Sequence, residues 1–466
     1  MKLWQKWWEL VQQLRPACAR SRTFFWLAVS LAGMTIRGDL LGVTSIVRAL
    51  GLQEKYYDRL LDFFHSPGVD LEKLTQIWKT MIFNCPTLLP KVNGRLLLVG
   101  DGLKVPKSGK KMPAVKKLHQ QSESNTKPQY IFGHSCQAIA VLAGVGLNIF
   151  ALPLICRIQE GLVFSNRDQR TLLDKMVELL LSLKLEPCYF IADAYYASQT
   201  IIRGLLALGS HLITRVRSNA VAYLPPEKSH PRIKRGRPRK YGPKIKLKSL
   251  FQAPDSWQTA ESPIYSEKNL QLRYQTLDLV WRPVGIPVRF VLVIHPHRGK
   301  IILMSTDLNL PPIEIIRLYG LRFKIELSFK QSLRTLGAYA YHFWMQVLSP
   351  LRKKSGNQYL HRQTQEYRKA VKRKIAAYHN HIQTGIIAQG LLQYLSLSFP
   401  QLVWASFGSW IRTARPGTCP SEQVTAIAMR NLLPEFLLDS FPAIKLIKFL
   451  RSIIDVSRTE GARLVA

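Results

Sequence analysis

Acidic residues are scarce in this chain of 466 residues. Asp and Glu together number 29, against 66 Lys and Arg, which gives a formal net charge of +37 at pH 7. Such an excess predicts a polyanionic partner, either a nucleic acid or an anionic membrane surface. The hydrophobic share of 47% is large enough for folded cores, so disorder of the whole chain is not expected.

Cysteine is also sparse. The six cysteines are scattered along the chain and form no CxxC pair. This spacing predicts neither a zinc site nor a disulfide framework, and each cysteine is expected to be a small buried apolar residue.

Uncharged stretches long enough for a membrane helix are nearly missing. Residues 138–155 form a run of 18 without charge, which is barely long enough to span a bilayer. The run contains Gly144, Gly146, Asn148 and Pro153, so we interpret it as two buried strands joined at a Gly-Leu-Asn turn. Because the N-terminal MKLWQKWWEL also lacks a cleavable signal pattern, we expect an intracellular protein without a membrane partner.

What is present is an alternation of strand and helix patterns between two helical ends. A chain of this length suggests about three domains. Short apolar runs predict buried strands at 96–99, at 188–192 and at 211–217, and an amphipathic helix covers 166–184 with Asn166 as its cap. The order of these elements predicts an α/β core with a mixed sheet.

Changes in composition divide the chain into five expected segments. Residues 232–248 hold nine Lys or Arg and no acid, which marks a basic insertion. The segments are an N-terminal helical part (1–90), the first part of the α/β core (91–218), a basic, β-rich insertion (219–300), the second part of the core (301–345), and a C-terminal helical part (346–466).

Two aspartates occupy equivalent places in the expected core. Asp101 follows the strand LLLVG and Asp193 follows the strand YFIA. Because sites in open α/β sheets lie at the carboxyl ends of strands, the two carboxylates can meet there. Two close carboxylates repel each other unless a cation lies between them, and hard oxygen ligands favour Mg²⁺ or Mn²⁺. The alternative for each aspartate alone is a turn or capping residue.

A third carboxylate stands in residues 319–333, YGLRFKIELSFKQSL. Helical spacing places four polar side chains on one face of this segment: Tyr319, Arg322, Glu326 and Lys330. An exposed helix with an ordinary Glu326–Lys330 ion pair is the simpler interpretation. Taken together with the two strand-end aspartates, Glu326 is expected to complete a two-metal site for phosphodiester chemistry.

The order of these motifs resembles that of the DDE transposases of the IS4 type. The matching residues are Asp101, Asp193, and the Tyr-x2-Arg-x3-Glu set Tyr319, Arg322 and Glu326, and the resemblance covers roughly residues 94–345. It implies a ribonuclease H-like catalytic domain, interrupted by the insertion and flanked by helical domains. It also implies that the three carboxylates bind two Mg²⁺ ions, for which Mn²⁺ can substitute.

The resemblance further implies a cut-and-paste transposase. Such an enzyme is a homodimer that pairs two transposon ends in a prokaryotic cytoplasm, close to the nucleoid, and can cleave through a DNA hairpin. With this resemblance, residues 1–90 are expected to read the DNA ends, and residues 346–466 are expected to serve dimerisation and DNA contact. One position departs from the family pattern, because Leu333 stands where the family has a lysine. Lys330 and Arg334 are the two candidates for the missing charge, and Lys330 lies better on the Glu326 face.

Two basic segments are candidate DNA-binding surfaces. KRGRPRKYG (234–242) resembles an AT-hook, in which Arg235, Arg237 and Arg239 enter a narrow minor groove. A solvated basic loop is the alternative. Residues 352–374 hold nine Lys or Arg against one acid and predict a second phosphate-binding face, with three tyrosines interleaved: Tyr359, Tyr367 and Tyr378.

The sequence therefore predicts a metal-dependent DNA transposase. A metal-dependent endonuclease without strand transfer and an inactive DNA-binding protein with the same fold are the alternatives, and a membrane-surface protein is a fourth possibility. His134, His295 and His297 lack metal-ligand spacing and are expected to be structural or to face phosphate.

Overall fold

The structure is a computed structural model of mixed α/β architecture. It describes residues 2–120, 128–226, 239–252, 257–264, 267–438 and 443–465. The chain packs into two compact units. The first unit contains Met1–Pro90, Gly102–Gln169 and Glu326–Ala466, and the second unit contains Lys91–Asp101 and Arg170–Ile325.

The N-terminal part of the first unit is helical, as the apolar periodicity predicts. Its helices are α1 (Leu3–Gln12), α2 (Ser21–Ile36), α3 (Val43–Ala49), α4 (Tyr56–His65) and α5 (Leu71–Phe83). The side chain of Asp70 caps α5 by accepting from the backbone N–H of Lys73. Trp4 is buried and its Nε1 donates to the carbonyl of Met429, 2.8 Å away, so the two ends of the chain share one core.

A long β-hairpin forms the sheet of the first unit. The strands are β3 (Lys116–His119), β4 (Tyr130–Val145) and β5 (Asn148–Ile158), and each neighbouring pair is antiparallel. The predicted strand pair within 138–155 is confirmed, with its turn at Gly146 and Leu147. At Gly144 a side chain would clash with the carbonyl of Asn148, which explains the glycine. Among the described residues no helix is long and apolar enough to cross a membrane.

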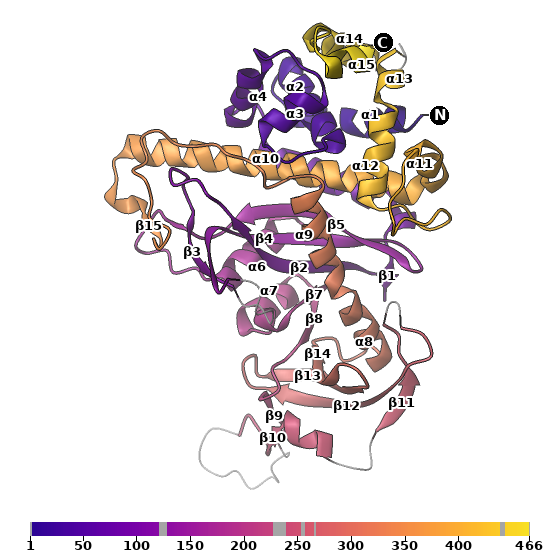
Figure 1. The fold of residues 1–466 in the computed structure, drawn as a ribbon. Coiled ribbons are helices and arrows are strands. Elements are labelled where there is room, and N and C mark those ends of the chain that lie inside the picture. The colour runs from indigo at the N-terminus through magenta and orange to yellow at the C-terminus, as the bar shows by residue number, and fades with distance from the viewer. Residues whose placement is uncertain are drawn as a thin grey trace. The chain divides into compact units, whose positions relative to one another are not determined.

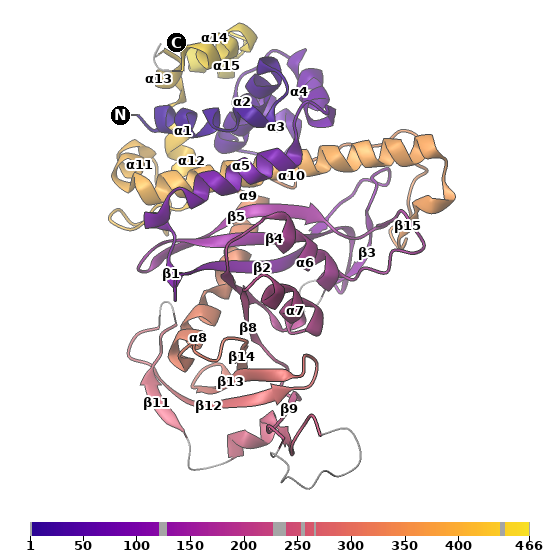
Figure 2. The ribbon, with the colours of Figure 1, turned by 180° about the vertical axis from the view of Figure 1, so that it is seen from behind.

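Helix α10 (Gln365–Ser398) organises the rest of the first unit. Gln383 Nε2 donates to the carbonyl of Leu154, so the helix is bonded to strand β5. On its other side α10 contacts α2, α4 and α5 (Figures 1 and 2). The remaining elements are β6 (Leu162–Val163), α9 (Lys324–Arg334), β15 (Gln358–Tyr359), α11 (Pro400–Phe407), α12 (Glu422–Asn431), α13 (Leu433–Leu438), α14 (Ile444–Ile453) and α15 (Thr459–Val465).

Burial on both sides makes Tyr378 of α10 a core residue. It is fully buried and its hydroxyl donates to the carbonyl of Phe343 at 2.6 Å. The expectation that Tyr378 belongs to a phosphate-binding face is therefore wrong.

The second unit is a mixed sheet with helices. Its strand order is β10-β9-β12-β13-β14-β8-β7-β2. The strands are β1 (Lys91–Val92), β2 (Arg95–Pro106), β7 (Cys188–Ala192), β8 (His211–Arg215), β9 (Val221–Tyr223), β10 (Lys244–Lys246), β11 (Gln258–Glu261), β12 (Gln271–Trp281), β13 (Ile286–His295) and β14 (Gly299–Ser305). β2, β7 and β8 run parallel, whereas β14 is antiparallel to β8, which confirms the expected mixed sheet.

Helices α6 (Leu172–Ser182), α7 (Gln199–Ala207) and α8 (Pro312–Gly320) complete the second unit. The prediction of a helix start at Asn166 is wrong. Thr171 caps α6 instead, because its side chain accepts from the backbone of Asp174 while the Asp174 carboxylate accepts from the backbone of Thr171. The β-rich part of residues 219–300 continues the sheet, since β13 pairs with β14 and β14 with β8.

Candidate active site

Asp101 and Asp193 follow two neighbouring parallel strands of the second unit. Strand β2 pairs with β7, and the last matched residues are Val99 and Ile191. Each aspartate comes two residues later on its strand, so the same register continued brings the two side by side. Neighbouring strands lie about 4.8 Å apart. The expected meeting of two carboxylates at the carboxyl edge of the sheet is consistent with this register.

Strand β8 adds a basic residue at the same edge. It pairs in parallel with β7 up to Ala192 and Thr214, and the next residues on the two strands are Asp193 and Arg215. Arg215 is exposed at the end of its strand. The sequence analysis missed it, because only the strand order β2-β7-β8 brings it beside the aspartates.

Asp193 is held in place by its neighbours. Its Oδ1 accepts from the backbone N–H of Tyr195 at 3.0 Å, and its carbonyl accepts from Thr214 Oγ1 at 2.7 Å. The side chain thus caps the 3₁₀ turn Ala194–Tyr196, which is the alternative role that the sequence left open. The Asp193 side chain is half-buried.

Asp101 is paired with a cation supplied by the protein. Arg322 Nη1 lies 3.4 Å from Asp101 Oδ2, and both side chains are largely buried. Tyr319 lies nearby, and burial raises the pKa of its phenol. Arg322 and Arg215 oppose this rise in the Tyr319 pKa and Asp193 adds to it, so all five side chains belong to one cluster of the second unit.

The segment that carries Tyr319 and Arg322 is not one continuous α-helix. Helix α8 ends at Gly320, a 3₁₀ turn covers Leu321–Phe323, and α9 begins at Lys324. The spacing predicted helix throughout this segment, and the structure interrupts the α-helix with a 3₁₀ turn at its centre. Tyr319, in the last turn of α8, and Arg322, in the 3₁₀ turn, still interact, because the Arg322 side chain acts to lower the pKa of the Tyr319 phenol.

Glu326 and Lys330 are exposed on α9. The boundary between the two compact units falls between Ile325 and Glu326. Glu326 therefore belongs to the first unit, one helical turn beyond Arg322 along the chain. Its place in a three-carboxylate site stays a prediction.

The donor set of this edge fits a hard divalent cation. Asp101 and Asp193 offer carboxylate oxygens on adjacent strand ends, which Mg²⁺ and Mn²⁺ prefer. Arg322 supplies the positive charge that this pair requires in the present arrangement. Within the described ranges, no group of three or more His, Cys, Asp or Glu side chains is close enough to hold a metal as they stand.

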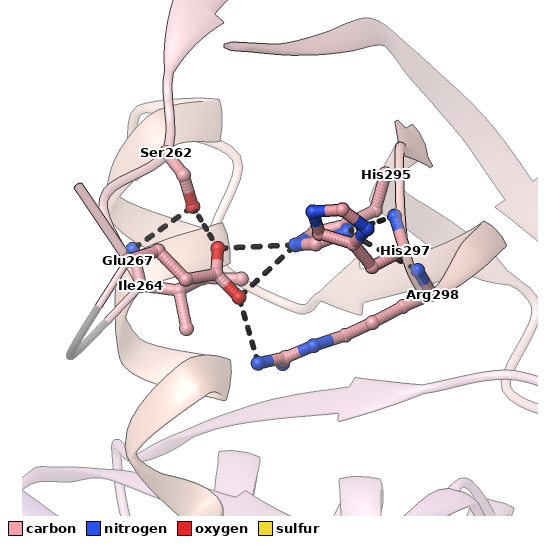
Figure 3. A network of polar contacts seen from close by, with 6 residues as sticks. All are labelled: Ser262, Ile264, Glu267, His295, His297 and Arg298. Carbon is pink, nitrogen blue, oxygen red and sulfur yellow. Dashed lines mark hydrogen bonds and ion pairs between the residues drawn. The ribbon is translucent and has the colours of Figure 1, made fainter. Parts of the chain in front are cut away.

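A polar network anchors the loop that packs against α8 (Figure 3). The carboxylate of Glu267 accepts from His295 Nε2 at 3.0 Å, from Arg298 Nη2 at 2.7 Å and from Ser262 Oγ at 2.5 Å. Ile264 of the same loop lies so close to Gly320 that a Cβ there would be 3.3 Å from it. His295 is thus structural, one of the two roles expected for it, and the network fixes the helix end just before Arg322.

The structure describes only some of the other residues that the sequence analysis singled out for contact with DNA or phosphate. Arg239 is exposed. Arg235 and Arg237 lie outside the described residues, so the AT-hook resemblance stays a prediction. His134 is fully buried and its ring nitrogens contact the Tyr341 hydroxyl and the carbonyl of Pro113, each at 2.9 Å, so it is structural.

The chain matches a protein-family model in sequence and resembles solved structures in fold. A family model described as DDE superfamily endonuclease matches residues 9–282, more than half of the chain, including Asp101 and Asp193 and ending before Glu326. One solved structure that the chain resembles is the piggyBac transposase in a synaptic complex with hairpin DNA. It is 11% identical, with a TM-score of 0.36, over 97% of this chain and 84% of that chain. No curated protein matches the chain. The family match shows that the chain belongs to the DDE superfamily endonucleases, which are nucleases.

Proposed function

We propose that this chain is a DNA transposase of the IS4 type with a ribonuclease H-like catalytic core. It cleaves DNA at the ends of a mobile element and joins the freed 3′ ends to target DNA. The observation that carries the proposal is the parallel pairing of β2 with β7. Continued by two residues, its register brings Asp101 next to Asp193, and Arg322 lies beside Asp101. Membership of the DDE superfamily endonucleases supports the phosphodiester chemistry.

Three carboxylates would hold the metal ions. Asp101 and Asp193 are the ligands from the sheet, and Glu326 is the ligand from α9. When bound, two Mg²⁺ ions supply an activated water or 3′-OH and stabilise the leaving oxygen of the phosphodiester. Mn²⁺ can take the same oxygen ligands.

The chain's own cations bind the scissile strand. Arg322 is paired with Asp101 at 3.4 Å, and its planar guanidinium can turn to two phosphate oxygens once another cation neutralises that carboxylate. Arg215, exposed at the end of β8, adds positive charge at the same edge. Lys330, exposed on α9, serves as a point charge in place of the family lysine at Leu333.

Tyr319 orients the substrate as a hydrogen-bond donor. Burial raises the pKa of its phenol, so the hydroxyl keeps its proton at neutral pH and can donate to a phosphate oxygen. Its interaction with Arg322 lets both groups reach the same phosphate.

The remaining DNA contacts and the assembly follow from the resemblance to the IS4-type enzymes. Arg235, Arg237 and Arg239 bind the minor groove, the N-terminal helices read the end sequence, and two copies pair two DNA ends. A net charge of +37 supports DNA as the partner.

Cleavage of the chain's own flanking terminal repeats tests this function. Incubation with Mg²⁺ is expected to release products with 3′-OH ends, and chelation of the metal abolishes them. The family description also supports the alternative of an endonuclease without strand transfer. Joining of a precleaved labelled DNA end to a plasmid distinguishes the transposase from that alternative. Cleavage that continues without any divalent ion contradicts the metal assignment, and binding without cleavage contradicts the enzyme.

A further inference from the structure

A basic pocket opens at the N-terminal end of α10, within the first unit. Its volume is about 290 Å³. The lining residues are Phe164, Gln365, Arg368, Lys369 and Lys372. We call it the α10 pocket.

The pairing of two short strands, distant in sequence, brings an aromatic ring to this helix end. Strand β6 pairs in parallel with β15, with Val163 opposite Tyr359, and Phe164 is the next residue after β6. A small apolar cluster fixes the two segments to α10, and it is built from Met345, Leu348, Leu360 and Val371, with Leu162 and Phe164 packed against them. The ring is therefore held by the fold and remains half-buried.

Three cations line the pocket together with this ring, and one of them, Lys372, lies over it. In the described part of the chain, Arg368, Lys369 and Lys372 form no ion pair with Asp or Glu, and the only acid in residues 352–374 is Glu366. The Lys372 ammonium lies 5.4 Å from the centre of the Phe164 ring. Nε of Arg368 is buried and has no hydrogen-bond partner among the described residues. Unsatisfied buried donors are rare in folded proteins and mark a place for a ligand.

We propose that the α10 pocket binds one nucleotide of an unpaired DNA strand. The base stacks on Phe164 in place of the Lys372 ammonium, and the adjoining phosphate accepts from Arg368 and Lys369. Single-strand sites of this kind combine aromatic rings with a basic path for the backbone. The proposal deepens the proposed function, since it takes DNA as the substrate and adds a site for a strand that leaves the duplex.

The aromatic ring decides between an unpaired strand and a duplex. Lysines and arginines alone bind duplex phosphates without entering the base stack. A half-buried ring inside a pocket contacts a base only when that base has left its stack, so Phe164 has no role on an intact duplex.

Binding of labelled oligonucleotides to the full chain tests the proposal, with EDTA present so that no cleavage occurs. The probes are a mixed-sequence single strand and a duplex of the same length. Phe164→Leu keeps the apolar packing and removes the flat ring. It is expected to weaken single-strand binding by at least about fivefold and to leave duplex binding unchanged. Unchanged single-strand affinity, or equal loss for both probes, overturns the proposal.

A matched charge variant provides the control. Lys372→Gln removes a pocket cation, whereas Lys353→Gln removes an exposed cation of the same basic segment outside the pocket. Lys372→Gln is expected to weaken single-strand binding several-fold more than Lys353→Gln, and equal effects contradict the site. A 2-aminopurine base in the single strand is expected to lose fluorescence on binding to the unaltered chain and not to Phe164→Leu.

The outcome is separable from that of the proposed function. If Phe164→Leu leaves binding unchanged while terminal repeats are cleaved with Mg²⁺, the pocket assignment fails and the transposase stands. If binding distinguishes the variants and no cleavage occurs, the pocket stands and the transposase fails.

Discussion

Arg322 reaches across to Asp101, with its Nη1 3.4 Å from the carboxylate Oδ2 and with 20% and 19% of the two side chains exposed. A largely buried carboxylate beside a second aspartate requires a neutralising charge. Arg322 provides it in the absence of a metal ion, and the proposed function gives the same role to Mg²⁺. The guanidinium and the metal therefore compete for Asp101.

Arg322→Ala separates these two roles. Without the competing guanidinium, Mg²⁺ is expected to bind the DNA-free chain more tightly, as measured by isothermal titration. Cleavage is expected to fall about ten- to hundredfold, because a charge-assisted bond to the scissile phosphate is lost. Arg317→Ala, on the preceding helix and paired with Glu314, is the control and should change neither quantity. Weaker Mg²⁺ binding in Arg322→Ala contradicts the competition.

Asp193→Asn tests the second carboxylate without disturbing the fold. Asparagine caps a helical turn as well as aspartate, so the bond from the Tyr195 N–H is kept. Loss of an outer contact to a metal ligand already costs 10–100-fold, so loss of a ligand charge should lower cleavage by more than about a hundredfold. The rate is measured on terminal-repeat DNA, and the melting temperature reports the fold.

The control for that substitution is Asp70→Asn, at the cap of α5. It makes the same chemical change at a capping aspartate of the first unit and is expected to leave cleavage intact. Equal activity of both variants and the unaltered chain means that Asp193 is a capping residue only.

Local patterns were sufficient to predict most of the elements that frame the site. The apolar run of Cys188–Ala192 is a fully buried strand, because a central parallel strand needs no polar face. The 3₁₀ turn at Leu321–Phe323 was not predictable, since Leu321 and Ile325 keep the apolar spacing of an α-helix and both are buried. The turn is a change of backbone hydrogen bonding that tertiary packing decides.

Contacts between elements distant along the chain explain what the sequence analysis missed. Arg215 reaches the candidate site only because β8 lies next to β7, and no local signal gives strand order. Tyr378 follows a basic segment whose pattern indicates an exposed helix, yet α10 is covered from both sides at that point. Partners distant in sequence decided the environment of each residue.

Glu267→Gln is expected to destabilise the hairpin of β13 and β14, whose first strand ends at His295. The substitution removes the charge that pairs with Arg298 and leaves a buried donor without its acceptor, which costs about 1–3 kcal/mol. Hydrogen exchange of β13 and β14 measures the loss. Glu261→Gln, in the same region and at an exposed position, is the control and should leave exchange unchanged.

The same carboxylate makes the stability of the β13–β14 hairpin depend on pH. Burial acts to raise the pKa of Glu267, but the bonds from Ser262 and His295 and the charge of Arg298 outweigh it and lower the pKa below its usual 4.5. A lowered carboxyl pKa contributes stability that is present above pH 4.5 and is lost as the pH falls through the folded value. Protection of β13 and β14 should therefore fall more steeply below pH 4.5 in the unaltered chain than in Glu267→Gln. Parallel curves would mean that the charge of Glu267 contributes nothing.

Lys107 predicts a pH dependence of the same sign in the first unit, at higher pH. Its Nζ is buried, bonded to the carbonyl of Tyr341 at 3.1 Å and 3.7 Å from the ring centre of that tyrosine. These contacts favour the ammonium, but burial outweighs them and lowers the pKa of Lys107 to about 7 from 10.5. Between these values the unfolded chain binds a proton that the folded chain lacks, so stability rises with pH, by at most about 1.4 kcal/mol per pH unit. Urea unfolding between pH 7 and pH 9.5 should show this rise in the unaltered chain and in Lys104→Met, an exposed position of strand β2 shortly before Lys107. Lys107→Met should lose it, and identical slopes for all three chains would show that Lys107 stays charged in the folded protein.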